Sequence, residues 1–258
     1  MKNEWWKSFY DENLAQVLLR PKDNNEAEKT VSFLTRELSL KPKARLFDQC
    51  CGNGRVSIPL AKNGFEIIGI DLAEGYILEA QSRAQAEADV ISTKFQIADA
   101  FTFSPQPLCD GALNWWTSFG YAETDSQNQL MIDCAYQALK PGAGFALDYM
   151  NVPGIYHSFQ PYVLNEQPTP QGNLKLERTS IIDFYTGRLK KTWLYTLPSG
   201  EQQEHHTSTC LYSPQRLISF FEASGFTNIR LFGDLDSSPL TLHSPRAIIC
   251  GTKPTSKQ

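Results

Sequence analysis

The apolar positions of the chain follow two different periods. Between residues 45 and 150, short runs rich in β-branched residues alternate with stretches whose apolar residues recur every three or four positions. The predicted strands are 45–49, 65–70, 93–98, 110–116 and 144–150, and the predicted helices are 54–62, 73–88 and 127–139. Strands that alternate with helices form βαβ units with right-handed crossovers. The pattern therefore predicts an α/β fold with a parallel sheet.

Two further helices are predicted ahead of this region. Residues 4–19 would place Trp5, Phe9 and Leu14 on one face, and a second helix would place Val31, Leu34 and Leu38 on one stripe. The "KPK" at 41–43 ends the second helix.

After residue 151 the apolar positions alternate in twos. Segments 174–183, 188–197 and 201–212 are joined by turn sequences, which predicts a three-stranded antiparallel meander. Ser213 and Pro214 then suit the N-cap and first position of a helix, and Gly225 suits its end. Segments 227–233 and 246–252 would form a final antiparallel pair.

Composition narrows the classes of function. The chain has 258 residues, 41% of them apolar, with a net charge of −4 and no basic stripe, so nucleic acid is not an expected partner. The N-terminal segment lacks a signal-peptide core, and no run reaches the roughly 18 apolar residues of a membrane span. Six cysteines without a C-x-x-C pair predict reduced thiols, no metal and a cytoplasmic protein.

The chemistry-bearing segment is "RLFDQCCGNGRVSIPLAKNGFEIIGIDLAE", residues 45–74. Asp48 lies near the end of one predicted strand, Gly52 and Gly54 lie in the turn, and Asp71 closes the next strand. Glycines let a ligand approach the backbone, and a carboxylate at Asp71 can accept hydrogen bonds from both hydroxyls of a ribose. Nicotinamide dinucleotide and S-adenosylmethionine both satisfy these requirements. The third glycine of the G-x-G-x-x-G dinucleotide motif is absent.

A wider set of segments carries a family resemblance. "LFDQCCGNG", "IIGIDLAEGYI", "IADAF", "DGALNWWTSFGY" and "ALKPGAGFALDYMN" together resemble the class I S-adenosylmethionine-dependent methyltransferases over about residues 45–151. Family members usually read D-x-G-x-G-x-G in the first turn, and Cys50 stands here at the first glycine. The resemblance implies a Rossmann-like, seven-stranded, mostly parallel sheet with helices on both faces, and S-adenosyl-L-methionine as cofactor.

The resemblance also implies four regions. These are an N-terminal helical lid (1–43), the cofactor-binding core (44–151), an antiparallel β insertion covering the substrate site (152–212), and a C-terminal helix and strand pair that completes the sheet (213–258). The aromatic residues Trp5, Trp6, Phe9 and Tyr10 would belong to the lid, although ordinary helix packing explains them equally well.

Roles for single residues follow from the same resemblance. Asp48 would orient the turn and the methionine amino group, Gly52 and Gly54 would pass beneath the ligand, and Asp71 would hold the ribose. The remaining cofactor residues would be Cys50 and Cys51 in the turn, Leu72 and Tyr76 beside the adenine, Asp99 and Ala100 at the adenine amino group, and Asn114 and Trp115 near the sulfonium. The expected substrate residues are Trp116, Ser118, Tyr121, Tyr149 and Trp193.

Each of these residues also has a purely structural explanation. Asp71 could cap the following helix, the two tryptophans could be core, and the paired cysteines could be small residues in a tight loop. His205 and His206 are neighbours on a predicted strand, so they should face opposite sides of the sheet. The occurrence of four motifs in order, each at the end of a strand, favours the functional interpretation.

The expected reaction is methyl transfer to a small-molecule acceptor, with an amine favoured over a hydroxyl or carboxylate because "TSFGY" and the insertion resemble N-methylating relatives. His157 is the first candidate for a general base, followed by either His205 or His206. The alternatives are an NAD-dependent oxidoreductase and a non-catalytic module that binds S-adenosylmethionine. A monomer or homodimer is expected, with no membrane partner.

Overall fold

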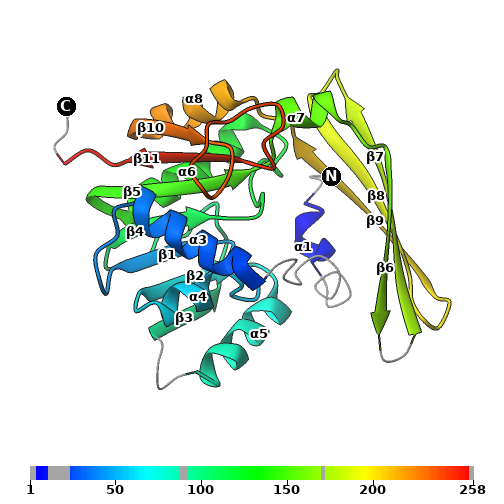
Figure 1. The fold of residues 1–258 in the computed structure, drawn as a ribbon, viewed down its shortest axis with the longest axis horizontal. Helices are drawn as coiled ribbons and strands as arrows, with labels where there is room; N and C mark the ends of the chain where they lie inside the picture. Colours follow the sequence, from blue (N-terminus) through cyan, green and yellow to red (C-terminus); the bar gives the residue numbers. More distant parts are fainter. Residues whose placement is uncertain (1–3, 11–23, 88–91, 170–171, 256–258) are drawn as a thin grey trace.

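The computed structural model describes residues 4–10, 24–87, 92–169 and 172–255. Its core is a seven-stranded sheet with the order β10-β11-β5-β4-β1-β2-β3 (Figure 1). The strands are β1 (Arg45–Gln49), β2 (Glu66–Asp71), β3 (Ser92–Ile97), β4 (Cys109–Asn114), β5 (Leu139–Tyr149), β10 (Thr227–Phe232) and β11 (Ala247–Thr252). β1 to β5 are parallel, and β11 runs antiparallel to both of its neighbours. The predicted α/β class and mostly parallel sheet are confirmed.

The first predicted strand matches β1 residue for residue, whereas β5 begins five residues earlier than predicted. The turn sequence Lys140-Pro141-Gly142 does end the preceding helix, but the chain continues there as an irregular strand. Backbone hydrogen bonds to Lys253 hold this part of the strand extended: Gly142 N donates to Lys253 O, and Lys253 N donates to Ala143 O. The partner lies more than a hundred residues away, so the local sequence carries no sign of it.

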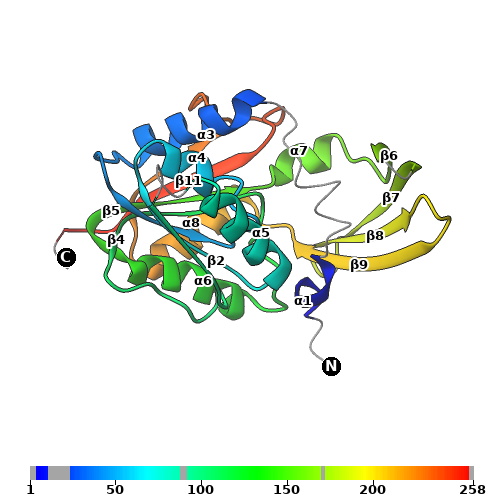
Figure 2. The same cartoon turned by 90° about the horizontal axis from the view of Figure 1, so that it is seen from below.

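Helices cover both faces of the sheet. α3 (Asn24–Glu37), α4 (Ser57–Lys62) and α5 (Glu74–Gln85) lie on one face, and α6 (Asp125–Ala138) and α8 (Pro214–Ser224) lie on the other (Figures 1 and 2). Successive residues of β1 serve the two layers: Leu46 belongs to the apolar cluster with Phe33 of α3, and Phe47 to the cluster with Ile132 of α6. The predicted Ser213 cap and Gly225 terminus of α8 are confirmed.

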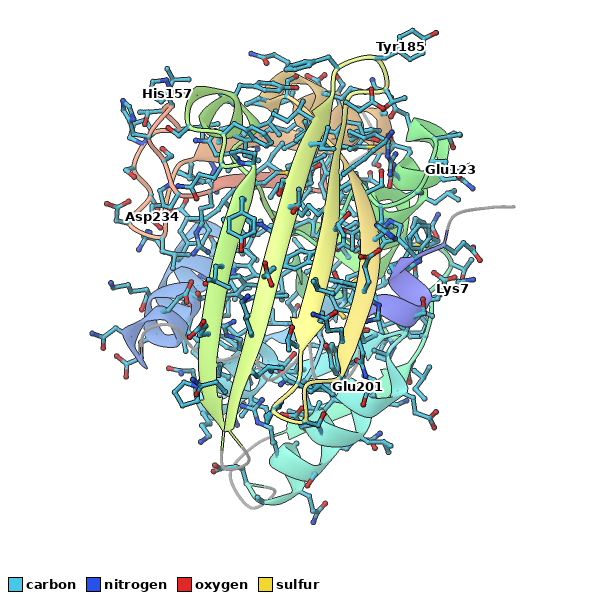
Figure 3. The ribbon with its side chains drawn as sticks, turned by 90° about the vertical axis from the view of Figure 1, so that its right-hand side faces the viewer. Lys7, Glu123, His157, Tyr185, Glu201 and Asp234 are labelled. Atoms are coloured by element: carbon cyan, nitrogen blue, oxygen red, sulfur yellow. The ribbon has the colours of Figure 1, made fainter. Side chains whose placement is uncertain are left out.

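The insertion is a separate antiparallel sheet of four strands, β6 (Tyr162–Thr169), β7 (Gly172–Asp183), β8 (Arg188–Thr196) and β9 (Gln202–Cys210). It is joined to β5 through α7 (Val152–His157) and lies across one side of the core (Figure 3). The prediction of a three-stranded meander was wrong, because the sheet has a fourth strand, β6. β6 has the sequence "YVLNEQPT", whose polar residues fall on both faces, so it shows no clear alternation. Its strand conformation depends on pairing with β7.

The described part of the N-terminal segment is the short helix α1 (Trp6–Phe9). Residues 11–19 of the predicted first helix lie outside the described residues. α1 lies between the core and the insertion, since the Trp6 ring is 6.1 Å from Phe101 after β3 and the Phe9 ring is 5.6 Å from Trp193 of β8. The N-terminal segment thus packs against both sheets, while its role as a lid stays a prediction.

Candidate functional site

A cavity opens at the carboxyl ends of β1 to β4, with about 960 Å³ of empty space including the part open to solvent. Ligands of open α/β sheets bind at this edge. Most of the predicted site residues line it, namely Asp48, Cys50, Cys51, Gly52, Asp71, Leu72, Tyr76, Asp99, Ala100, Trp115, Trp116, Ser118 and Tyr121. The structure therefore brings together side chains that are spread over more than seventy residues of sequence.

Asp48 is the most deeply buried carboxylate of the cavity, with 1% of its surface exposed. The Ser57 hydroxyl at the start of α4 donates to its Oδ2 at 2.6 Å. Its other oxygen, Oδ1, accepts no hydrogen bond from the described residues. Burial raises the pKa of Asp48 to about 7, against the lowering effect of the Ser57 hydrogen bond. The carboxyl group is thus poised to gain a positively charged partner.

The first turn reaches the cavity through its backbone. Gly52 has a φ of +54°, and a Cβ added there would meet only the Tyr76 ring, at 4.0 Å, so this side of Gly52 faces open space. Cys50 also takes a left-handed φ, +64°, at the position where relatives usually have glycine. The loop keeps a glycine-type conformation there at a cost of order 1–2 kcal/mol.

Gly54 has different surroundings from Gly52. It does not line the cavity, and a Cβ at this position would lie 3.2 Å from both Ile58 of α4 and Phe95 of β3. Its φ of +78° adds a conformational requirement for glycine. Gly54 therefore allows α4 to pack closely on the sheet, and its role beneath the ligand stays a prediction.

Asp71 combines a structural role with an open face. Its Oδ2 accepts from Gly52 N at 2.9 Å and its Oδ1 from Ala73 N at 3.0 Å, so the carboxylate ties the first turn to the start of α5. Each oxygen can accept one more hydrogen bond. Burial raises the pKa of Asp71, opposed by hydrogen bonds from the backbone N–H groups of Ala73, Gly52 and Leu72. At the next strand end, Asp99 Oδ1 accepts from Phe101 N at 2.9 Å, and Asp99 also lines the cavity.

Aromatic residues of the N-terminal segment meet Tyr121 at the cavity wall. The hydroxyls of Tyr10 and Tyr121 share a hydrogen bond of 2.6 Å, and the Trp5 ring lies 4.6 Å from Tyr121. Trp6 and Tyr10 both line the cavity. Burial is the largest cause of a raised pKa in both tyrosines, so each keeps its hydroxyl proton at neutral pH.

The two adjacent tryptophans have opposite environments. Trp115 is 2% exposed, packs near Phe33, and its Nε1 has no hydrogen-bond partner among the described residues. Trp116 is 36% exposed and has a φ of +61°. The Arg55 guanidinium lies 4.2 Å from the centroid of the Trp116 ring, a cation–π contact at the cavity wall.

Five predicted site residues lie away from the cavity wall. Gly54 is described above; Asn114 is buried and donates to Gln49 Oε1 at 3.1 Å, and the Tyr149 hydroxyl donates to Cys210 O. Trp193 lies within the insertion, where its Nε1 donates to Thr207 Oγ1 at 3.0 Å. His157 is exposed on α7, with its ring 5.1 Å from His243 (Figure 3).

The two adjacent histidines lie on opposite faces of the insertion sheet, as predicted. The His205 ring contacts Phe9 and Tyr195 on the side toward α1, while His206 pairs with Glu204 on the other side. Neither lines the cavity.

Several lining residues were not among the predicted ones, namely Asn53, Arg55, Val56, Ala98, Phe101 and Met131. Asn53 and Arg55 flank Gly54, so their position in the turn was a usable signal. Met131 lies in the middle of α6, and nothing in its local sequence distinguishes it from an ordinary core residue.

Comparison with known proteins identifies the core. Residues 46–142 match the family model described as a methyltransferase domain. The chain carries a class I S-adenosylmethionine-dependent methyltransferase domain. YqeM of Bacillus subtilis, which its name assigns to the methyltransferases, is 30% identical to this domain over 105 residues. That match covers 41% of this chain and 42% of YqeM, so the chain spans less than half the length of this relative.

Solved structures share the arrangement of the whole chain around the methyltransferase domain. The CcbJ methyltransferase from Streptomyces caelestis superposes with a TM-score of 0.76 at 13% identity, over 93% of this chain and 96% of that one. The sugar N-methyltransferase KedS8 from Streptoalloteichus gives 0.72 at 18% identity, over 91% and 90%. At these identities the likeness establishes a common fold. In the described part of this chain, every helix is too short or too polar to cross a bilayer.

Proposed function

We propose that this chain transfers a methyl group from S-adenosylmethionine to a small-molecule acceptor. The observation that carries the proposal is the meeting of Asp48, Asp71 and Asp99, from the ends of three successive parallel strands, on one cavity wall. A dehydrogenase needs a carboxylate for the ribose after the second strand, but it has no requirement for one after the third.

The residues of the cavity fit the parts of this cofactor. The free Oδ1 of buried Asp48 suits the methionine ammonium, and the open side of Gly52 leaves room for the ligand against the backbone. Asp71 retains acceptor capacity on both oxygens for the ribose hydroxyls. Leu72 and Tyr76 would then flank the adenine, with Asp99 accepting from its amino group.

The cofactor supplies an activated methyl group on a positively charged sulfur. The protein has to align the acceptor with the methyl carbon and to exclude water. Binding both molecules in one site gives the alignment, and surrounding aromatic residues exclude water. Trp6, Tyr10 and Trp115 provide that enclosure. Their ring faces would also attract the sulfonium charge.

An amine is the favoured acceptor. Among proteins of the same fold, KedS8 is named as a sugar N-methyltransferase, and MtfA, at a TM-score of 0.57, as a glycopeptide N-methyltransferase. A neutral amine needs no general base for methyl transfer. We therefore propose no general base for an amine acceptor. This agrees with the position of His157, which lies away from the cavity wall. A hydroxyl or carboxylate acceptor stays as the alternative.

Calorimetric titration with S-adenosylmethionine, S-adenosylhomocysteine and NAD in parallel tests the cofactor. Micromolar binding of the two sulfur ligands and none of NAD would support the proposal, and binding of NAD alone would replace it with an oxidoreductase. Cofactor binding without turnover on any amine, alcohol or acid of a broad panel would favour the non-catalytic module. The six free cysteines suit the reducing cytoplasm that we expect as its compartment.

A further inference from the structure

Two cations on the inner face of the insertion sheet have no carboxylate partner in the part of the chain that the structure describes. This face is the one that carries Leu176, Trp193 and Tyr195 toward α1. Arg178 of β7 is two residues from Leu176, and Lys191 of β8 is two residues from Trp193, so both lie on this same face. Both are only partly exposed, and neither takes part in an ion pair with the described residues. Their neighbours on the outer face are neutralised: Lys175 pairs with Glu177 at 2.8 Å, and Lys190 with Asp183 at 2.6 Å.

Strand register brings the two cations into one cluster. Arg178 is directly opposite Trp193, and Lys191 is directly opposite Ser180 on one side and Thr207 on the other. Directly paired residues have their Cβ atoms about 5 Å apart. The Arg178 guanidinium and the Lys191 ammonium lie 5.8 and 5.5 Å from the centroid of the same Trp193 ring. The indole, the two cations and the serine therefore form one surface.

Polar groups in this cluster lack partners. Arg178 Nε and Ser180 Oγ are buried and accept or donate no hydrogen bond within the described residues. Burial, and secondly the charge of Arg178, lowers the pKa of Lys191 to about 8. Burial also lowers the pKa of Arg178. Buried donors and like charges destabilise a fold unless a counter-group satisfies them, so this cluster is suited to an anionic ligand.

The N-terminal segment connects the cluster with the cofactor cavity. Trp193 packs against Phe9 of α1, and Trp6 and Tyr10 of the same N-terminal segment line the cofactor cavity. The insertion sheet covers this side of the core, with its inner face toward α1 (Figures 1 and 3). A molecule held between core and insertion can thus contact the cluster with one end.

We propose that Arg178, Ser180 and Lys191 bind an oxyanion, the carboxylate or phosphate group of an acidic methyl acceptor. The inference rests on the proposed function, because it names the class of substrate for that reaction. Arginine presents a planar pair of donors that matches either oxyanion, lysine adds a compact charge, and the serine hydroxyl supplies a further donor. Trp193 shields these contacts from solvent on one side.

The test begins with the simplest probes, inorganic phosphate and acetate, titrated at constant ionic strength into protein saturated with S-adenosylhomocysteine. The variants are Arg178→Gln and Lys191→Gln, and Lys190→Gln on the outer face is the matched control. We expect at least one anion to bind, with affinity reduced roughly 10- to 100-fold in each inner-face variant and unchanged in Lys190→Gln. Binding of phosphate or of acetate then tells the two oxyanions apart.

The same proteins are then compared with matched amines, glucosamine against its 6-phosphate and tyramine against tyrosine. The acidic member should be preferred at least tenfold, and the preference should vanish in Arg178→Gln and Lys191→Gln. Absence of anion binding, its survival in both variants, or equal loss in Lys190→Gln would overturn the inference. If S-adenosylhomocysteine itself does not bind, the proposed function fails, while the anion titration of the free protein still decides whether the subsite exists.

Discussion

Arg178 and Lys191, the inner-face cations without an ion pair among the described residues, should carry a measurable cost in stability. Lys191→Met keeps the length and most of the apolar surface of the side chain and removes its charge. The ordinary lysine pKa of 10.5 falls to about 8 in the folded protein. At ~1.36 kcal/mol per pKa unit, this fall corresponds to an upper limit of about 3.4 kcal/mol. Partial exposure screens part of it, so we expect Lys191→Met to stabilise the fold by ~1–3 kcal/mol at pH 7.

The pH dependence has a definite sign. Between pH 8 and 10.5 the unfolded chain holds the Lys191 proton and the folded protein has lost it, so the free energy of unfolding of the wild type rises with pH. The cost is fully present below pH 8 and disappears above 10.5. The advantage of Lys191→Met should therefore shrink on going from pH 7 to pH 10.

Urea unfolding of wild type and variant at pH 7 and pH 10 measures both effects, with the midpoint and slope fitted at each pH. Lys190→Met is the control, because Lys190 is ion-paired on the exposed face and should change stability by less than ~1 kcal/mol. Destabilisation by Lys191→Met at pH 7, or an equal stability difference at both pH values, would show that the ammonium is well solvated and refute the reasoning.

Three further predictions concern the cavity. Asp71→Ala should weaken binding of S-adenosylhomocysteine by ~1.5–3 kcal/mol, because it removes a charged hydrogen-bond acceptor. An unchanged affinity in calorimetry would show that Asp71 does not bind the ribose. Because the pKa of Asp48 is raised to about 7, the ammonium of S-adenosylhomocysteine should displace its proton, so the affinity for this ligand should fall as pH is lowered from 8 to 6. Asp48→Asn should abolish that dependence. A wild-type affinity that does not change with pH would contradict the prediction. Gly54→Ala should lower the free energy of unfolding by ~1–3 kcal/mol, since its Cβ would press on Ile58 and Phe95, and an unchanged urea midpoint would mean that α4 shifts freely.

Predictions from sequence held where the signal was local. The strand β1, the cap of α8 and the opposite faces of His205 and His206 each depend on residues within a few positions of one another. They failed where a distant partner decides the conformation. β6 is a strand because β7 pairs with it, although its own polar residues obscure the alternation.

Site residues divide in the same way. Asp48, Asp71 and Asp99 could be placed at one cavity because each lies at or near the end of a recognisable strand, and the ends of parallel strands meet at one edge of a sheet. Gly54 shows the limit of this reasoning, because the family resemblance implied only a place beneath the ligand, and the structure adds that a Cβ here would press on Ile58 and Phe95. Only the packed structure shows that this glycine lies against α4.

The sequence by itself determined the α/β core, the turn with its glycines, and the carboxylates at the strand ends, since hydrophobic period and turn residues act over short distances along the chain. The tertiary structure alone decided that Tyr10 meets Tyr121 at the cavity and that Arg178 and Lys191 lie against the same Trp193 ring. Such contacts depend on how separate elements pack and on the register between strands. Neither is encoded in a local pattern, because each is set by the free energy of the whole fold.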